Sequence, residues 1–302
     1  MPMPEGAAMW IEVVAVGLST PESAPLYHYR PGSVSLRLYT GPRGLGVSYD
    51  CGGVGFDVCE WLEKPASFPR YRVRLDVLRR LGERWGAESV ILDGLESWSY
   101  ASIVSSVGLP LVVRSQGLEK PSGEVLSLVD ALIADYTYPI LGKPELNSSL
   151  GETVRLAYSM GVWVEAAAYM ESPLEPEMLA PALDALEPGT PLHVFIADPM
   201  GGGPVSRLWK TLSSSHWPVY IHSPPYSQLD TFCPSCGTVL ATRSEGVLTA
   251  LELAQNGGCP RCGREIPLRG GWGRSTPRRL RAVAPEGVYW LDPRSLGGVP
   301  IR

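Results

Sequence analysis

Residues 161–198 read GVWVEAAAYMESPLEPEMLAPALDALEPGTPLHVFIAD, and this stretch decides the fold class. The apolar runs 162–168 and 192–197 have the length of buried strands, and the segment 176–186 between them has the length of a helix. A strand, a helix and a second strand in this order favour two parallel strands joined by a right-handed crossover. The stretch therefore predicts an α/β fold.

The same alternation continues on both sides of this unit. Further strand-like runs lie at 46–49, 89–92, 109–113, 131–134 and 219–221. Candidate helices lie at 72–85, 149–160 and 205–212. Ser149 and Glu152 have the S-x-x-E spacing of a capping box, which predicts that a helix begins there. Because six or seven units follow one another, a partial (β/α)6-type TIM barrel is favoured over an open parallel sheet.

In either architecture, ligands bind where the strands end at their C-terminal edge. The polar residues in or just after the predicted strands are Asp50, Asp93, Glu96, Arg114, Gln116, Asp135, Glu165, His193 and Asp198. The carboxylates among them would suit acid/base catalysis if they converge on one pocket. The alternative for each residue is that it only caps a helix or faces solvent. The four histidines, His28, His193, His216 and His222, show no metal-ligand spacing and are expected to be structural.

Two C-x2-C pairs near the C-terminus predict a metal site. CPSCG and CPRCG each place a glycine after the second cysteine, and 22 residues separate the pairs. Four thiolates, from Cys233, Cys236, Cys259 and Cys262, suit one tetrahedral zinc ion with a structural role. The alternatives are a rubredoxin-like iron or a redox pair. The intervening segment resembles a hairpin or a strand plus a helix that is too small to fold alone, so metal binding and folding should be coupled.

Arginines are concentrated around this metal module. Between residues 261 and 281 the only acidic residue is Glu265, and the arginines are Arg261, Arg264, Arg269, Arg274, Arg278, Arg279 and Arg281. Together with Trp272, they are suited to binding the phosphates and bases of RNA. The alternative is an arginine-rich tail that docks on an acidic protein body.

Composition bounds the remaining possibilities. The net charge of −5 over 302 residues argues against a nucleic-acid binder whose whole surface is basic, so a basic patch must be local. No apolar run reaches membrane-spanning length, and the N-terminus lacks the pattern of a secretory signal, so we expect a soluble, cytoplasmic protein. The C-x2-C pairs favour a reducing compartment, and 29 prolines fit a thermophile.

These observations divide the chain into four expected regions. The N-terminal β extension, with strand-like runs at 10–17 and 33–39, covers 1–42. The partial barrel covers 43–226, the zinc module 227–270 and an Arg-rich tail 271–302.

Several motifs resemble one family in their order along the chain. DTFCPSCGTVL at 230–240 and GGCPRCGREIP at 257–267 are similar to the C-terminal end of radical S-adenosylmethionine proteins of the AmmeMemoRadiSam type, relatives of pyruvate formate-lyase activating enzymes. Upstream, the motifs that resemble the same family are PLYHYRPGS at 25–33, LVDALIADY at 128–136, MGVWVEAAAYMESP at 160–173 and TPLHVFIADP at 190–199. The resemblance covers roughly residues 25–270 and implies a partial barrel.

The resemblance also implies an iron–sulfur cluster, but the motif for it is broken. In the family, a C-x3-C-x2-C loop followed by Trp holds a four-iron four-sulfur cluster that binds and cleaves S-adenosylmethionine. Here the loop at 50–61 reads DCGGVGFDVCEW. Aligning Cys59 with the third cysteine puts Phe56 and Gly52 at the other two positions, with Cys51 one place away. Two thiolates cannot supply three ligands.

Other positions of the family are partly kept. By resemblance, Glu96 corresponds to an acidic residue near the methionine amino group, Asp135 to a strand aspartate near the cofactor, and Glu165 to a glutamate on the fifth strand. The lysine that usually follows the aspartate is replaced by Thr137. The Gly-rich DPMGGGP at 198–204 would suit a small anion or a flexible loop.

Two functional hypotheses follow from these motifs. In the first, the chain is a pseudoenzyme without a standard cluster that binds a protein partner, a nucleotide-like ligand or RNA, and Cys51 and Cys59 are buried thiols or a disulfide. In the second, it is an active radical S-adenosylmethionine enzyme whose cluster is completed by a non-cysteine ligand or a partner chain.

Overall fold

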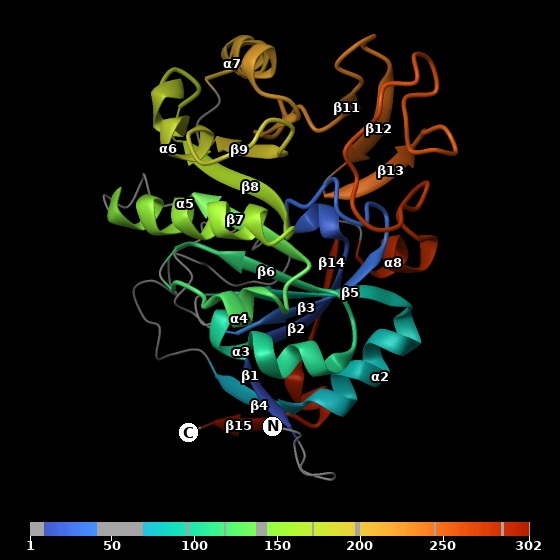
Figure 1. The fold of residues 1–302 in the computed structure, drawn as a ribbon. Coiled ribbons are helices and arrows are strands. Elements are labelled where there is room, and N and C mark those ends of the chain that lie inside the picture. The colour runs from blue at the N-terminus through green and yellow to red at the C-terminus, as the bar shows by residue number, and fades with distance from the viewer. Residues whose placement is uncertain are drawn as a thin grey trace.

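The computed structural model describes residues 9–40, 69–94, 97–117, 119–136, 144–170, 172–196, 200–244, 246–284 and 287–301. Its central element is a nine-stranded mixed sheet (Figure 1). In spatial order the strands are β10 (Val219–His222), β9 (Leu192–Ile196), β8 (Trp163–Met170), β7 (Ala131–Tyr136), β6 (Leu111–Ser115), β5 (Ala87–Asp93), β3 (Val34–Tyr39), β2 (Ala15–Ser19) and β14 (Val288–Leu291).

Strands β3, β5, β6, β7, β8, β9 and β10 are parallel and lie side by side in chain order. Among the described residues, the connections between these strands place helical segments on one face of the sheet: α2 (Leu75–Trp85), α3 (Ser97–Val104), η4 (Ser105–Val107), α4 (Gly123–Leu126), α5 (Pro144–Ser159), η6 (Pro176–Leu179), α6 (Ala180–Leu183) and α7 (Gly202–Ser215). On the edge beyond β3, β2 and β14 run antiparallel to their neighbours. The expected α/β class is confirmed.

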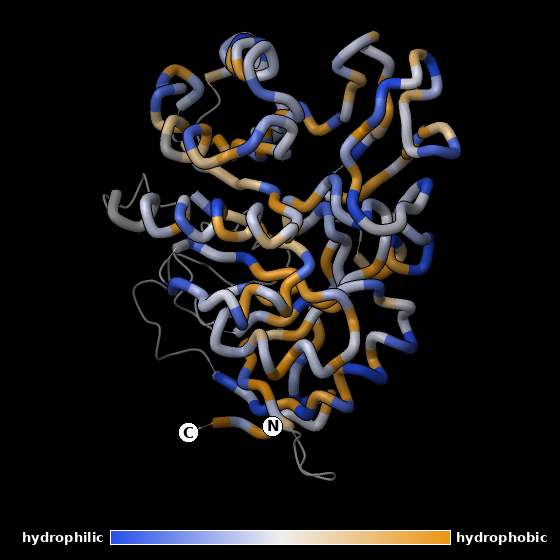
Figure 2. Tube along the Cα trace, in the orientation of Figure 1, coloured by the Kyte–Doolittle hydropathy of each residue, from blue (hydrophilic) through white to orange (hydrophobic). Residues whose placement is uncertain are grey.

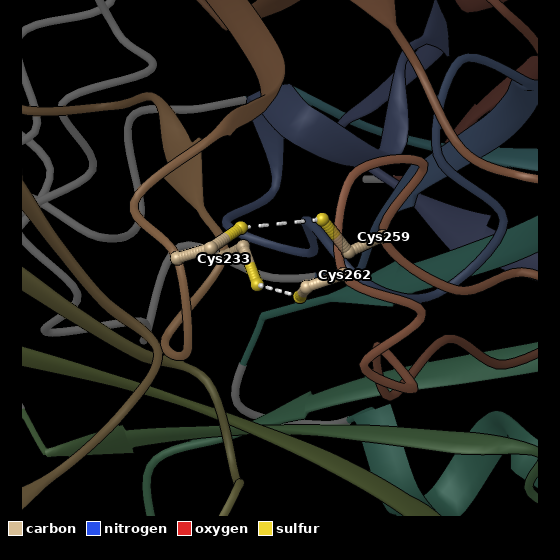
Figure 3. Close-up of side chains that lie close together, drawn as sticks. Cys233, Cys259 and Cys262 are labelled. Atoms are coloured by element: carbon tan, nitrogen blue, oxygen red, sulfur yellow. Dashed lines mark hydrogen bonds between the residues drawn. The ribbon is translucent and has the colours of Figure 1, made fainter.

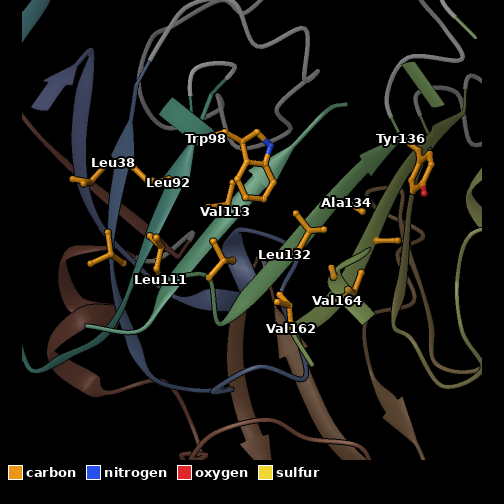
Figure 4. Packing of buried hydrophobic residues seen from close by; sticks show 14 of the residues in the cluster. Leu38, Leu92, Trp98, Leu111, Val113, Leu132, Ala134, Tyr136, Val162 and Val164 are labelled. Atoms are coloured by element: carbon orange, nitrogen blue, oxygen red, sulfur yellow. The ribbon is translucent and has the colours of Figure 1, made fainter. Parts of the chain in front are cut away.

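The main apolar core lies between this sheet and the helices. Alternate strand residues such as Leu92, Val113 and Leu132 face the helices and pack with Trp98 of α3 (Figure 4). Figure 2 shows the same distribution along the chain, with apolar residues concentrated on the strands and hydrophilic residues on the outward turns of α2. Because strand side chains alternate between the two faces, the other face is available for different residues.

Two smaller sheets complete the structure. The first contains β1 (Trp10–Val13), β4 (Arg70–Arg74) and β15 (Val299–Ile301), so it joins segments from both ends of the chain (Figure 1). The second contains β11 (Thr231–Phe232), β12 (Val239–Ser244) and β13 (Val247–Leu251). The remaining elements are η1 (Pro21–Ser23), α8 (Arg278–Val283) and η7 (Pro293–Leu296). None of the helices in the described ranges combines the length and apolarity of a membrane span.

The structure corrects several expectations. The strand expected at 33–39 is β3, which lies inside the large sheet rather than in an extension, because it pairs with β5. The helix expected from Ser149 begins at Pro144, so the S-x-x-E motif is not its start. Residues 271–302 contribute α8, β14 and β15 rather than a tail.

Other expectations have different outcomes. Residues 72–74 of the helix expected at 72–85 belong to β4, which pairs with both β1 and β15. The run at 46–49 lies outside the described residues. The partial barrel stays a prediction.

Candidate functional site

The face of the large sheet that is turned away from helices α2–α7, here called the inner face, carries a row of polar residues that are all buried except the partly buried His222. It contains Arg37, Asp93, Arg114, Asp135, Glu165, His193 and His222. The sequence analysis located the strands that carry these residues by their apolar runs alone. The row divides into an Arg–Asp chain and a cluster around Glu165.

The Arg–Asp chain alternates in sign across four neighbouring strands. Arg37 donates two hydrogen bonds to Asp93, one of them from Nε to Oδ2 at 3.1 Å. Arg114 lies between the two aspartates, with Nη1 3.7 Å from Asp93 Oδ2 and Nε 2.8 Å from Asp135 Oδ2. Burial alone would raise the pKa of Asp93, but the Arg37 and Arg114 guanidinium groups outweigh it and hold that pKa below its usual value. The four side chains are therefore paired with one another inside the protein.

Glu165 on β8 is fully buried and accepts hydrogen bonds from the chain segment that precedes β3. The backbone N–H groups of Tyr27 and His28 donate to its two oxygens at 2.7 and 2.8 Å. Trp163 Nε1 donates at 3.1 Å, and His193 Nε2 lies 3.2 Å from Oε2. Burial raises the pKa of the Glu165 carboxyl, and the hydrogen bonds it accepts act in the opposite direction. Glu165 thus fastens the segment 25–33 across the inner face.

Neutral histidines surround this carboxylate. His193 Nδ1 lies 3.1 Å from His222 Nε2, and burial lowers the pKa of both rings well below the usual value. Burial also lowers the pKa of His28 to about 4. Since the carbonyl of Pro267, 2.6 Å away, can only accept, His28 Nδ1 donates to it and Nε2 accepts from the Tyr220 hydroxyl, also at 2.6 Å. The expectation that these histidines are structural agrees with this bonding.

Arg243 on β12 brings the C-terminal module onto the inner face. Its guanidinium lies 4.1 Å from the centroid of the Tyr27 ring and 5.4 Å from that of Tyr220. Nη1 donates to Thr231 Oγ1 at 2.8 Å and to the carbonyl of Leu229 at 3.0 Å. Sequence reasoning missed Arg243 and Tyr220, because nothing in the local sequence pairs residues that are so far apart along the chain.

The structure therefore places the residues predicted to lie at the strand ends in different surroundings. Asp93, Arg114 and Asp135 meet in the Arg–Asp chain, while Glu165 and His193 belong to the second cluster. Gln116 is buried, and its Oε1 has no hydrogen-bond partner in the described part of the chain. The remaining candidates, Asp50, Cys51, Cys59, Glu96 and Asp198, lie outside the described residues.

The four cysteines of the two C-x2-C pairs form one compact group (Figure 3). All four sulfur atoms lie within 4.8 Å of one another, and two pairs are 3.5 Å (Cys233–Cys262) and 3.6 Å (Cys236–Cys259) apart. A tetrahedral ion with metal–sulfur bonds of about 2.3 Å requires sulfur–sulfur separations of about 3.8 Å. The group can therefore hold a metal ion.

Both pairs use the same backbone geometry. The N–H groups of Gly237 and Gly263 each donate to the carbonyl of the first cysteine at 2.9 Å, with φ of +70° and +74°. Glycine adopts this left-handed conformation without a steric cost. Hydrogen bonds from Thr238 lower the pKa of Cys236 to about 6, whereas burial and the neighbouring thiols raise the pKa of Cys262 to about 12. Strands β12 and β13 between the pairs form an antiparallel hairpin, the first of the two structures expected for this segment.

The arginines around the module are mostly exposed. Among the described residues, none of the seven between 261 and 281 forms an ion pair with a carboxylate. Arg279 contacts the protein body: its guanidinium lies 4.0 Å from the Trp85 ring centroid, and it donates to the carbonyl of Arg84. The expected docking of an arginine tail on acidic residues is thus absent from the described part of the structure.

No protein-family model and no curated protein sequence matches the chain. Among solved structures, the 3-dehydroquinate dehydratase from Aquifex aeolicus VF5 is similar, with a TM-score of 0.30 and 15% sequence identity over 48% of this chain and 71% of that one. A TM-score this low supports no inference about fold or activity.

Proposed function

We propose that this chain is a radical S-adenosylmethionine-fold protein that acts as a partner-binding pseudoenzyme and lacks a standard four-iron four-sulfur cluster. The observation that carries the proposal is the state of Asp135 and Glu165, the two described positions that the resemblance assigns to cofactor binding. Both are fully buried and hydrogen-bonded to the protein's own groups.

Glu165 has no acceptor capacity left for a ligand. An ionised carboxylate offers about four lone-pair sites. In this structure, donors lie at four positions around it: two backbone N–H groups, the Trp163 indole and the His193 imidazole. A cofactor that used Glu165 would have to displace the segment 25–33.

Asp135 is paired with an arginine of the protein itself through one of its oxygens, Oδ2. Arg114 Nε donates to it at 2.8 Å, with both side chains at most 4% exposed. Because Arg114 also lies against Asp93, a ligand ammonium group at Asp135 would disturb a charge-balanced chain. The inner face is thus suited to holding the sheet together.

The strand order supports the barrel part of the proposal. Parallel strands that follow chain order, with the described crossover helices on one face, are what a partial (β/α)6-type barrel requires. The broken cysteine loop at 50–61 supports the absence of a standard cluster.

Zinc is the metal we propose for the four cysteines. The donor set and sulfur separations fit it, and the protein supplies all four ligands, which is typical of structural sites. Bound there, zinc would stabilise the fold of the module. Cys233 and Cys259 are buried in a small apolar cluster with Leu240 and Ile266, so the cysteines also form the core of the module.

Metal and sulfide analysis, with an absorption spectrum, on protein purified and reconstituted without oxygen tests the proposal. We expect one zinc per chain and no bound iron, unchanged in the Cys51→Ala/Cys59→Ala double variant. About four irons per chain, with absorbance bleached by dithionite and lost in that variant, would overturn the proposal and favour an active enzyme with atypical ligation. One iron without sulfide, lost in Cys236→Ser, would replace zinc by a rubredoxin-like site.

A further inference from the structure

The segment 269–274, RGGWGR, lies on the outside of the molecule between the metal module and the N-terminal segment 28–32. Arg269 N–H donates to the carbonyl of His28, and Arg30 N–H donates back to the carbonyl of Arg269, each at 2.9 Å. Gly273 N–H donates to the carbonyl of Pro31 at 2.9 Å. Its backbone is therefore fixed while its side chains face outward.

Trp272 is held by the turn that leads into the second cysteine pair. Its ring lies against Gly257, where an added Cβ would come within 3.3 Å of it. The ring nevertheless remains 43% exposed. A half-exposed indole is a flat surface on which a base can stack.

Three arginines belong to the backbone segments around Trp272. Arg264 adjoins the same turn, because its carbonyl accepts from Cys259 N–H at 2.8 Å and lies beside Gly258. Arg269 and Arg274 bracket Trp272 in sequence, and the carbonyl of Arg274 accepts from Leu251 N–H at 2.7 Å. All three arginine side chains are exposed. We call Arg264, Arg269, Trp272 and Arg274 the Trp272 surface.

We propose that the Trp272 surface binds single-stranded nucleic acid, with a base stacked on Trp272 and phosphates bound by the arginines. The guanidinium fork matches phosphate geometry, and the stacked indole accepts any base. Since the whole chain carries a net charge of −5, a polyanion would be attracted locally, by the exposed arginines of the Trp272 surface, beside which Glu265 is the only acidic residue between 261 and 281. The inference deepens the proposed function by giving the pseudoenzyme a partner.

Fluorescence anisotropy of a labelled oligouridine with the full-length, metal-loaded protein tests this. We expect the affinity to fall with salt, with a log–log slope of about −2 for three phosphate contacts to a single strand. Trp272→Ala should weaken binding about tenfold or more, and Trp272→Phe should retain most of the affinity. The matched control is Trp10→Ala, because Trp10 is 39% exposed on the remote small sheet.

The same anisotropy measurement with oligodeoxythymidine distinguishes RNA from single-stranded DNA as the ligand. Equal affinity for both strands supports recognition of the shared chemistry, and a preference for oligouridine supports RNA through 2′-hydroxyl contacts. Equal losses in Trp272→Ala and Trp10→Ala, or binding without salt dependence, would overturn the inference. Finding an iron–sulfur cluster would overturn the proposed function while leaving this binding test unaffected, so the two failures are distinguishable.

Discussion

The inner face of the sheet and the Trp272 surface both use arginine, but in opposite ways. Arg37 and Arg114 are buried, and each one bonds to an aspartate. Arg264, Arg269 and Arg274 are exposed and have no carboxylate partner among the described residues. A desolvated guanidinium must be paired to be tolerated, whereas a hydrated one is free to meet a ligand. The difference indicates which surface holds the fold and which one is available for binding.

The two regions are nevertheless connected through the segment 27–32. Tyr27 and His28 bond to Glu165 on the inner face, while Arg30 and Pro31 bond to the segment that carries Trp272. The carbonyl of Pro267 in the metal module also accepts from His28. Loss of the metal site should therefore also destabilise the sheet, whereas substitution of an exposed arginine should not.

Loss of the metal should have the largest effect. Cys236→Ser, or removal of the metal by a chelator, should unfold the module around β11–β13, since structural zinc contributes on the order of 10 kcal/mol to the folding of small modules. Limited proteolysis and the fluorescence of Trp217, which packs in the cysteine cluster, report this directly. Ser235→Ala in the same turn is the control and should keep the metal. A Cys236→Ser variant with the wild-type proteolysis pattern would contradict a structural role.

Breaking the Arg–Asp chain should cost somewhat less. Asp135→Ala leaves Arg114 buried without its closest carboxylate, and the free energy of unfolding measured in urea should fall by about 3–5 kcal/mol. The control is Glu152→Ala, which breaks the exposed ion pair with Lys120 and should cost less than about 1 kcal/mol.

A double variant separates burial from charge. Asp135→Leu combined with Arg114→Met removes both charges and should be far more stable than Asp135→Ala alone. Equal stability of the two variants would show that the pair does not act as a charge pair.

Glu22 is a buried carboxylate that has no hydrogen-bonded arginine in the described structure. It therefore tests whether a buried charge must be paired to be tolerated. Burial raises its pKa to about 7, opposed by Arg243, and Oε1 accepts from Gly32 N–H at 2.7 Å. The pKa of Glu22 is higher in the folded protein than the value of 4.5 expected in the unfolded chain. Protonation of Glu22 therefore stabilises the folded protein fully below pH 4.5, and this stabilisation is lost as the pH rises through 7.

Glu22→Gln removes this titration. The variant should be more stable than the wild type by about 3 kcal/mol near pH 8.5 and equally stable near pH 4. Melting temperatures at both pH values measure the difference, and a difference that does not change with pH would contradict a raised pKa.

The sequence predicts the parts of this molecule that depend on local patterns. The apolar runs at 131–134 and 192–197 mark β7 and β9 because parallel strands buried on both faces are nearly continuous in apolar residues. The cysteine site is predicted from spacing because each pair occupies one turn. Glu165 is recognisable in the sequence as a charged residue within such an apolar run, but its hydrogen-bond partners are not recognisable there.

Contacts between distant segments cannot be predicted in the same way. The donors to Glu165 include main-chain N–H groups, which every residue has, so no sequence signal marks Tyr27 or His28. The pairing of β15 with β4 joins the end of the chain to residues far from it in sequence. Helix α5 begins at Pro144 rather than Ser149, because proline is itself favoured in the first turn of a helix.

A single exposed arginine should have the smallest effect on stability and an effect on binding alone. Arg274→Gln should change the free energy of unfolding by less than about 0.5 kcal/mol, because its side chain is exposed and makes no ion pair in the described structure. The same change should reduce the salt slope of oligouridine binding by about 0.7, the value of one phosphate contact.

The matched control is Arg79→Gln on α2, whose exposed side chain pairs with Glu83 and lies outside the Trp272 surface. If Arg79→Gln lowers the slope as much as Arg274→Gln does, attraction comes from charge spread over the whole protein. The contrast between the buried and the exposed arginines would then no longer identify a binding surface.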